Sequence, residues 1–216
     1  QMRTDKVQPS ILYPAAKRLL DIIMALTGAI ILLPFWIIVW FSILIEDGFP
    51  VFIKQERIGK HGKVFQAFKI RTMHKSELDA KVNHQAQEND PRVTVVGRLL
   101  RKTALDESPQ LLNILRGEMS FVGPRPLLTT EVELHNPVEL DMRKIPGYEQ
   151  RTSVIPGLTG IAQVYASRDI SRHKKFEYDI DYIRRRCLLT DTKLILMSLA
   201  VTFLGRWETR RVKLRL

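Results

Sequence analysis

The stretch IIMALTGAIILLPFWIIVWFSILI, residues 22–45, contains no charged residue and decides how this chain is built. At a helical rise of about 1.5 Å per residue, it is long enough to cross a hydrocarbon core of about 30 Å. It is also longer than the apolar part of a cleaved signal peptide, which extends over roughly 7 to 15 residues. The sequence therefore predicts a membrane helix near the N-terminus.

Pro34 lies near the middle of this run and predicts a break, because proline lacks the amide hydrogen that a continuous helix uses. Both flanks are basic, with Lys17 and Arg18 before the run and Lys54 and Arg57 after it. Basic flanks tend to stay on the cytoplasmic side. A re-entrant helix that is broken at Pro34 and enters and leaves through one leaflet satisfies both flanks. A kinked helix that spans the bilayer is the alternative.

Near the other end of the chain, residues 194–204 are amphiphilic and precede a tail rich in arginine and lysine. This pattern is typical of a helix lying in the membrane interface, with its basic tail on anionic headgroups. A core helix followed by a frayed basic tail is the alternative reading.

Between these segments the patterns predict an α+β fold that is mainly helical. Two short strands, 52–55 and 64–71, flank a glycine-containing loop and predict a small β-hairpin. Helices are expected over 95–105, 110–115 and 174–186, and residues 76–88 are expected to form a surface helix or a loop.

The charge and composition limit the possible partners and metals. Lysine and arginine total 34 against 23 acidic residues, a net charge of +11, which indicates nucleic acid, anionic lipid or a phosphate-bearing substrate as the partner. The single cysteine, Cys187, excludes an internal disulfide framework, and the five histidines lack zinc-site spacing. A magnesium ion with oxygen ligands is the metal that fits such a chain.

The adjacent acids Asp106 and Glu107 are the strongest candidates for chemistry. They are expected near a helix N-terminus, whose dipole favours their ionised forms, and Arg98, Arg101 and Lys102 lie shortly before them. An ionised aspartate among cations can attack phosphorus to form an acyl phosphate, although such a pair more often only caps a helix.

No phosphate-binding glycine loop of the mononucleotide or dinucleotide type is present in the sequence. Phosphate recognition must therefore use side chains, and the candidates are Lys69, Arg71, Arg101 and Arg125.

Five sequence blocks carry a resemblance to a known family. They are FIKQERIG at 52–59, FKIRTM at 68–73, LRKTALDESPQL at 100–111, MSFVGPRP at 119–126 and PGLTGIAQV at 156–164. With these blocks in this order, the sequence resembles the bacterial sugar transferase family, the monotopic phosphoglycosyl transferases, in their small minimal form.

The resemblance implies a two-step transfer of a sugar 1-phosphate from a UDP-sugar to polyprenyl phosphate, with release of UMP. By position, Asp106 would be the nucleophile, and Glu107 would help to deprotonate the lipid phosphate or to organise magnesium, with both acids as metal ligands. Arg101 and Arg125 would hold phosphates, and Lys69 and Gln163 would contact substrate.

The resemblance also implies a division of the chain and a location. Residues 1–48 would form the N-terminal segment and re-entrant membrane helix, 49–204 a cytoplasmic catalytic domain on the membrane surface, and 205–216 a basic tail. The protein would act at the bacterial cytoplasmic (inner) membrane, supplying downstream glycosyltransferases, with no role for nucleic acid.

Two departures from the family pattern stand out. Leu33 precedes Pro34 where relatives often have serine, and residues 165–168 read YASR where many relatives carry a Gly-Arg pair. We expect the second departure to affect sugar preference.

The main alternative function is a membrane-tethered, non-catalytic binder of polyanions or anionic lipid. Such a binder would account for the positive charge and the apolar anchor of the chain but not for the acidic pair.

Overall fold

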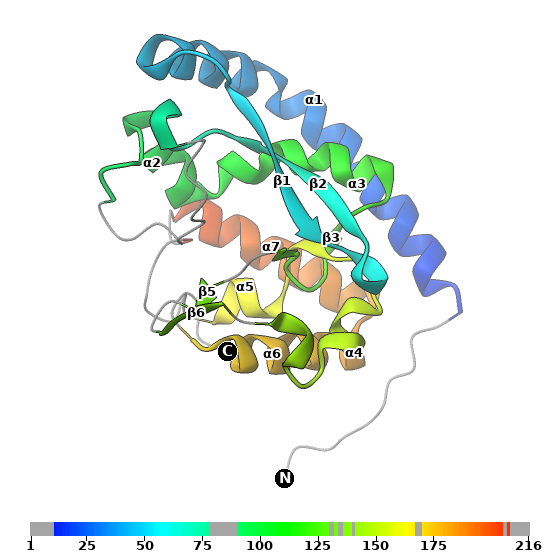
Figure 1. Ribbon diagram of the computed structural model, residues 1–216. Coiled ribbons are helices and arrows are strands. Elements are labelled where there is room, and N and C mark those ends of the chain that lie inside the picture. Colours follow the sequence, from blue (N-terminus) through cyan, green and yellow to red (C-terminus); the bar gives the residue numbers. More distant parts are fainter. Residues whose placement is uncertain are drawn as a thin grey trace.

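The apolar segment forms one long helix, α1 (Tyr13–Asp47), in a computed structural model of the protein (Figure 1). The structure describes residues 11–77, 90–129, 132–133, 136–139, 141–166, 170–204 and 207. Most of the stretch 76–88 and of the tail 205–216 lies outside these residues, so the predictions for them stay predictions.

Helix α1 continues through Pro34, so the break predicted there is not confirmed. A proline removes one backbone hydrogen bond and bends a helix, and the axis of α1 changes direction along its length in Figure 1. Residues on both sides of Pro34 pack against the rest of the protein: Ala25 lies in one buried cluster and Ile43 in another. Both halves of α1 are therefore attached to the folded domain.

Most of the surface of α1 is apolar and exposed. Its most apolar stretch has a mean hydropathy of 2.6, and only 11% of that stretch is buried, whereas a core helix would be mostly buried. Length and composition would allow this helix to cross a membrane. Contact with the bilayer remains a prediction that this surface supports.

Polar contacts attach the N-terminal part of α1 to the folded domain. Arg18 donates to the carbonyl oxygens of Ile114 and Leu115 at 2.6 and 2.9 Å, and Asp21 accepts from the backbone N–H of Phe121 at 3.0 Å. Lys17 forms an ion pair with buried Asp191 at 2.6 Å. These bonds fix the orientation of the apolar helix relative to the domain.

The predicted hairpin is present. Strands β1 (Phe52–Ile58) and β2 (Val64–Ile70) pair antiparallel around the short 3-10 helix η1 (Lys60–Gly62), and β4 (Leu127–Leu128) adds a third strand beside β1. In a second sheet, β3 (Ser120–Val122) pairs parallel to β7 (Gly157–Thr159). In another two-stranded sheet, β5 (Val132–Glu133) pairs antiparallel with β6 (Asn136–Glu139).

The remaining elements are helical, which confirms the prediction of a mainly helical fold. The short 3-10 helices are η2 (Lys75–Glu77), η3 (Leu105–Gln110) and η4 (Met142–Lys144). The α-helices after α1 are α2 (Val95–Thr103), α3 (Leu111–Arg116), α4 (Tyr148–Thr152), α5 (Ile161–Tyr165), α6 (Arg172–Arg185) and α7 (Leu188–Phe203).

Helix α7 covers the segment predicted as an interfacial helix. Asp191, Leu194 and Val201 are buried on one side, whereas Leu196 and Phe203 are exposed. The described part of α7 therefore has both a core face and an exposed apolar face, and its place in a membrane interface stays a prediction.

Candidate active site

Asp106 and Glu107 lie in the first turn of η3, as expected for a pair near a helix N-terminus. Helix α2 ends at Thr103, and Ala104 adopts a left-handed conformation, φ 55°, that reverses the chain into η3. In the sequence, Thr103 followed three residues later by Asp106 resembles a capping box, but the Thr103 hydroxyl donates back to the carbonyl oxygens of Leu99 and Leu100. Sequence spacing alone did not separate these two uses of a threonine.

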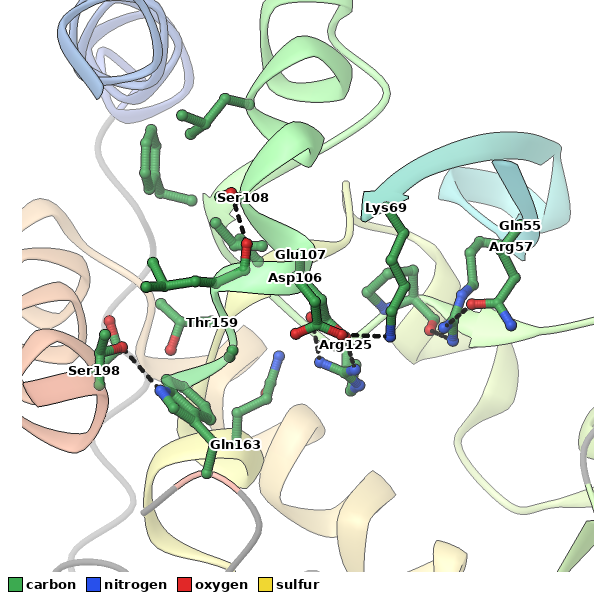
Figure 2. Close-up of a pocket in the computed structure, with 18 of the residues that line it drawn as sticks. Gln55, Arg57, Lys69, Asp106, Glu107, Ser108, Arg125, Thr159, Gln163 and Ser198 are labelled. Atoms are coloured by element: carbon green, nitrogen blue, oxygen red, sulfur yellow. Dashed lines mark hydrogen bonds and ion pairs between the residues drawn. The ribbon is translucent and has the colours of Figure 1, made fainter. Parts of the chain in front are cut away.

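Each acid of the pair has a cationic partner from another element. Lys69 Nζ on β2 lies 2.7 Å from Asp106 Oδ2, and the guanidinium of Arg125 donates to both oxygens of Glu107, one of these bonds being 3.0 Å (Figure 2). Asp106 and Glu107 are buried, at 3% and 8% exposure. The site therefore holds two acids in a cationic environment largely removed from water.

The two acids differ in their pKa values. Burial raises the pKa of Asp106 above its usual range, and the charge of Glu107 adds to this, against the opposing effects of Lys69 and Arg101. Burial alone would also raise the pKa of Glu107, but Arg125 and Lys69 outweigh it and lower that pKa to about 2. Glu107 is thus a fixed anion, whereas Asp106 is the more basic of the two.

A second buried ion pair supports the loop that carries Arg125. Arg151 on α4 donates to the carbonyl oxygen of Arg125, and its Nε lies 2.7 Å from Asp179 Oδ2 on α6. Burial raises the pKa of Asp179, and Arg151 opposes that rise. Neither residue was a candidate from the sequence, because charged pairs far apart in the chain give no local signal.

Arg57 is a further site residue that the sequence reasoning missed. Its guanidinium donates to the carbonyl oxygen of Pro126 at 3.1 Å and to the side chain of Gln55 at 2.6 Å, and its charge helps to lower the pKa of Glu107. It lies in the FIKQERIG block, where it was considered only as part of a basic flank.

One cavity of about 1210 Å³ brings most of the predicted site residues together. Asp106, Glu107 and four of the predicted ligands, Lys69, Arg101, Arg125 and Gln163, line it. Residues 23, 24, 27, 28, 31 and 32 of α1 also line it. The cavity wall thus combines carboxylates and cations with apolar side chains of helix α1.

Arg71 also lies in the cavity wall, but its hydrogen bonds point elsewhere. It is 1% exposed, and its guanidinium pairs with Asp47 and donates to the carbonyl oxygens of Asp47 and Gly48. These contacts hold the C-terminal end of α1 against β2 and its following loop, so the described hydrogen bonds of Arg71 stabilise the fold.

The two carboxylates of the site could bind magnesium together with oxygens from the substrate. Magnesium prefers hard oxygen ligands and often takes only one or two from the protein. Asp106 and Glu107 offer such oxygens, although Lys69 and Arg125 already contact them. Within the described ranges, no group of three His, Cys, Asp or Glu side chains is placed to hold an ion. A magnesium ion here would need substrate phosphates and water to complete its coordination.

Comparison with known proteins agrees with the resemblance. The chain is 36% identical over 206 residues to the exopolysaccharide production protein ExoY of Sinorhizobium fredii, covering 88% of this chain and 87% of the relative. It is 38% identical over 195 residues to the UDP-glucose:undecaprenyl-phosphate glucose-1-phosphate transferase of Caulobacter vibrioides, covering 88% and 70%.

A third relative, the galactosyl transferase CpsE of Streptococcus agalactiae, is 36% identical over 204 residues, which cover 88% of this chain and 42% of that protein. The family model described as bacterial sugar transferase matches residues 12–205. The chain therefore belongs to the bacterial sugar transferase family.

Proposed function

We propose that this protein transfers a sugar 1-phosphate from a UDP-sugar to polyprenyl (undecaprenyl) phosphate and releases UMP, through a covalent phosphosugar intermediate on Asp106. The observation that carries the proposal is buried Asp106, 2.7 Å from Lys69, in a cavity that extends to the apolar helix α1. The Caulobacter relative is named for such a transfer with glucose 1-phosphate.

In the first step, a carboxylate oxygen of Asp106 attacks the β-phosphorus of the donor. The bond between that phosphorus and the oxygen bridging to the α-phosphate breaks, and UMP leaves with the electron pair. Lys69 and Arg101 oppose the effect of burial on the pKa of Asp106, and they would offset repulsion between carboxylate and diphosphate.

In the second step, a phosphate oxygen of the lipid attacks the same phosphorus, and the bond to Asp106 breaks. The lipid then carries a sugar diphosphate, and Asp106 returns as a carboxylate. Glu107 is a weak base, because its pKa is lowered to about 2. We therefore propose that Glu107 positions Arg125. Together with Asp106 it would also bind magnesium, and a bound magnesium ion would neutralise charge on the diphosphate.

The shape of the cavity suits a lipid acceptor. Ile23, Ile31 and Leu32 of α1 contribute apolar side chains to its wall, and Ile23 and Ile31 are more than half exposed on the molecular surface. An isoprenoid chain lying along α1 in one leaflet could thus place its phosphate at Asp106. We propose that the domain lies on the cytoplasmic face of the inner membrane and catalyses the first membrane step of glycan assembly.

Turnover tests the proposal. The protein in lipid nanodiscs is given single UDP-sugars, undecaprenyl phosphate and magnesium, and UMP release is measured. We expect UMP release with at least one UDP-sugar, its loss in Asp106→Asn, and its retention in Asp181→Asn, an exposed acid on α6. A protein that binds polyanions in a salt-dependent way but never releases UMP would instead be a membrane-tethered binder.

A further inference from the structure

Thr159 has a hydroxyl group that the fold leaves without a hydrogen bond. The residue is 4% exposed, and among the described residues no group forms a hydrogen bond with its Oγ1. Burial of an unpaired hydroxyl costs free energy, and a bound ligand can remove that cost by supplying a partner. Thr159 lines the same cavity as Asp106 and Glu107.

The position of Thr159 is fixed relative to the reacting groups. It ends β7, pairs with Val122 of β3, and its carbonyl oxygen accepts from the N–H of Gly123 at 2.9 Å. Two residues beyond Gly123, Arg125 contacts Glu107. Figure 2 shows Thr159 on the opposite side of the acidic pair from Lys69, between that pair and Ser198 of α7.

Polar groups without charge occur beside Thr159 in the cavity wall, which also contains cations. Gly160 follows Thr159, and a Cβ atom at Gly160 would lie 2.8 Å from the side-chain oxygen of Gln163, so the buried Gln163 amide lies against the residue next to Thr159. Hydroxyl and amide groups suit sugar hydroxyls, which both donate and accept hydrogen bonds, whereas phosphates favour cations.

Resting on the function proposed above, we infer that Thr159 is a sugar-specificity residue whose hydroxyl binds a hydroxyl group of the transferred hexose. The hexose is attached directly to the β-phosphorus that Asp106 attacks, so its hydroxyls are the neutral polar groups of the donor next to the acidic pair. The nucleoside lies one phosphate farther away, and the isoprenoid chain carries no hydroxyl that Thr159 could bind.

A substitution series isolates this hydroxyl. Thr159→Val keeps the shape of the side chain and removes the hydroxyl, and Thr159→Ser restores it. Thr152→Val is the matched control, because Thr152 is a buried threonine whose hydroxyl bonds to carbonyl oxygens within α4. For each protein, kcat/KM is measured with the preferred UDP-sugar and with analogues that each lack one hexose hydroxyl, and affinity for UDP is measured alongside.

We expect Thr159→Val to lower kcat/KM for the preferred sugar about five- to tenfold, the factor typical of one hydrogen bond. With one deoxy analogue this difference should vanish, because the bond is already missing. Thr159→Ser should restore most of the activity, and affinity for UDP should not change. An equal loss with every analogue, or a parallel loss of UDP affinity, would overturn the inference.

The same proteins distinguish this inference from the proposed reaction. If no UDP-sugar is turned over by the unmodified protein, the proposed reaction fails, and the affinity of UDP-hexoses relative to UDP is then compared by calorimetry. A hexose-dependent affinity that is lost in Thr159→Val would support the subsite without the chemistry. An unchanged hexose contribution in Thr159→Val would overturn it.

Discussion

The indole nitrogen of Trp36 donates to the hydroxyl oxygen of Ser108 at 2.8 Å, which joins the apolar helix α1 to the turn that carries Asp106 and Glu107. Ser108 in turn donates to the carbonyl oxygen of Leu105 at 2.6 Å. A tryptophan in the candidate membrane helix thus contacts the short 3-10 helix of the site, two residues from the proposed nucleophile. The position of α1 and the geometry of the acidic pair are therefore linked.

Removing this bond should slow catalysis more than it weakens substrate binding. We expect Trp36→Phe to lower kcat about three- to tenfold, because one hydrogen bond no longer holds η3, while the affinity for UDP-sugar changes little. Ser108→Ala should have a similar effect, and the double variant should be no worse than either single variant. Additive losses in steady-state kinetics would show that the two residues act separately, and Trp40→Phe serves as the control.

The charge of Lys69 should set the acid limb of the pH–rate profile. Asp106 must be ionised to attack, so activity falls as the pH drops through its pKa. Lys69 lowers that pKa against the effect of burial, and Lys69→Met should therefore move the acid limb to higher pH, with a larger loss at pH 6 than at pH 8. Profiles of kcat/KM at fixed magnesium measure this. A uniform loss across the pH range would assign Lys69 to substrate binding alone.

The Arg151–Asp179 pair should contribute strongly to stability. Both side chains are 5% exposed or less, and removal of one partner leaves an uncompensated buried charge. We expect Arg151→Met to cost about 3 to 5 kcal/mol, which corresponds to roughly 10 °C in Tm for a chain of this size. The double variant Arg151→Met with Asp179→Leu should regain part of the loss. Thermal unfolding in one detergent compares the three proteins, and an unchanged Tm in Arg151→Met would contradict the prediction.

Magnesium should bind tightly only together with a diphosphate. The site offers two adjacent carboxylates, both already in contact with cations, so the protein alone supplies few free ligands. Calorimetry should detect little heat with magnesium and protein, and clear binding once UDP is present. Tight magnesium binding without nucleotide would indicate that the protein supplies more of the coordination shell.

Local patterns predicted the parts of the fold that depend on local sequence. The length of the uncharged run predicted the long apolar helix. The glycine-containing loop 59–63 between two short strands predicted the hairpin. The acidic pair was placed in the first turn of a helix, as observed for Asp106 and Glu107. Five sequence blocks were enough to recognise the family.

The features that are not confirmed or were missed depend on tertiary contacts. The break at Pro34 was expected from one missing hydrogen bond and is not confirmed, because α1 continues through the proline and packs against the domain on both sides of it. The hydrogen bonds of Arg71 to Asp47 and the end of α1, and the bond of Trp36 to Ser108, could not be predicted from the sequence, and a phosphate contact of Arg71 stays a prediction. Single-residue properties do not specify such partners.

The covalent intermediate is the central claim, and peptide mass spectrometry after a single turnover tests it most directly. The enzyme is mixed with its UDP-sugar and magnesium without lipid, quenched, digested, and compared with a sample that then receives undecaprenyl phosphate. The account predicts a hexose phosphate adduct on the peptide that contains Asp106, formed together with UMP and lost when the lipid is added. An enzyme that turns over with lipid but carries no adduct under these conditions would contradict it.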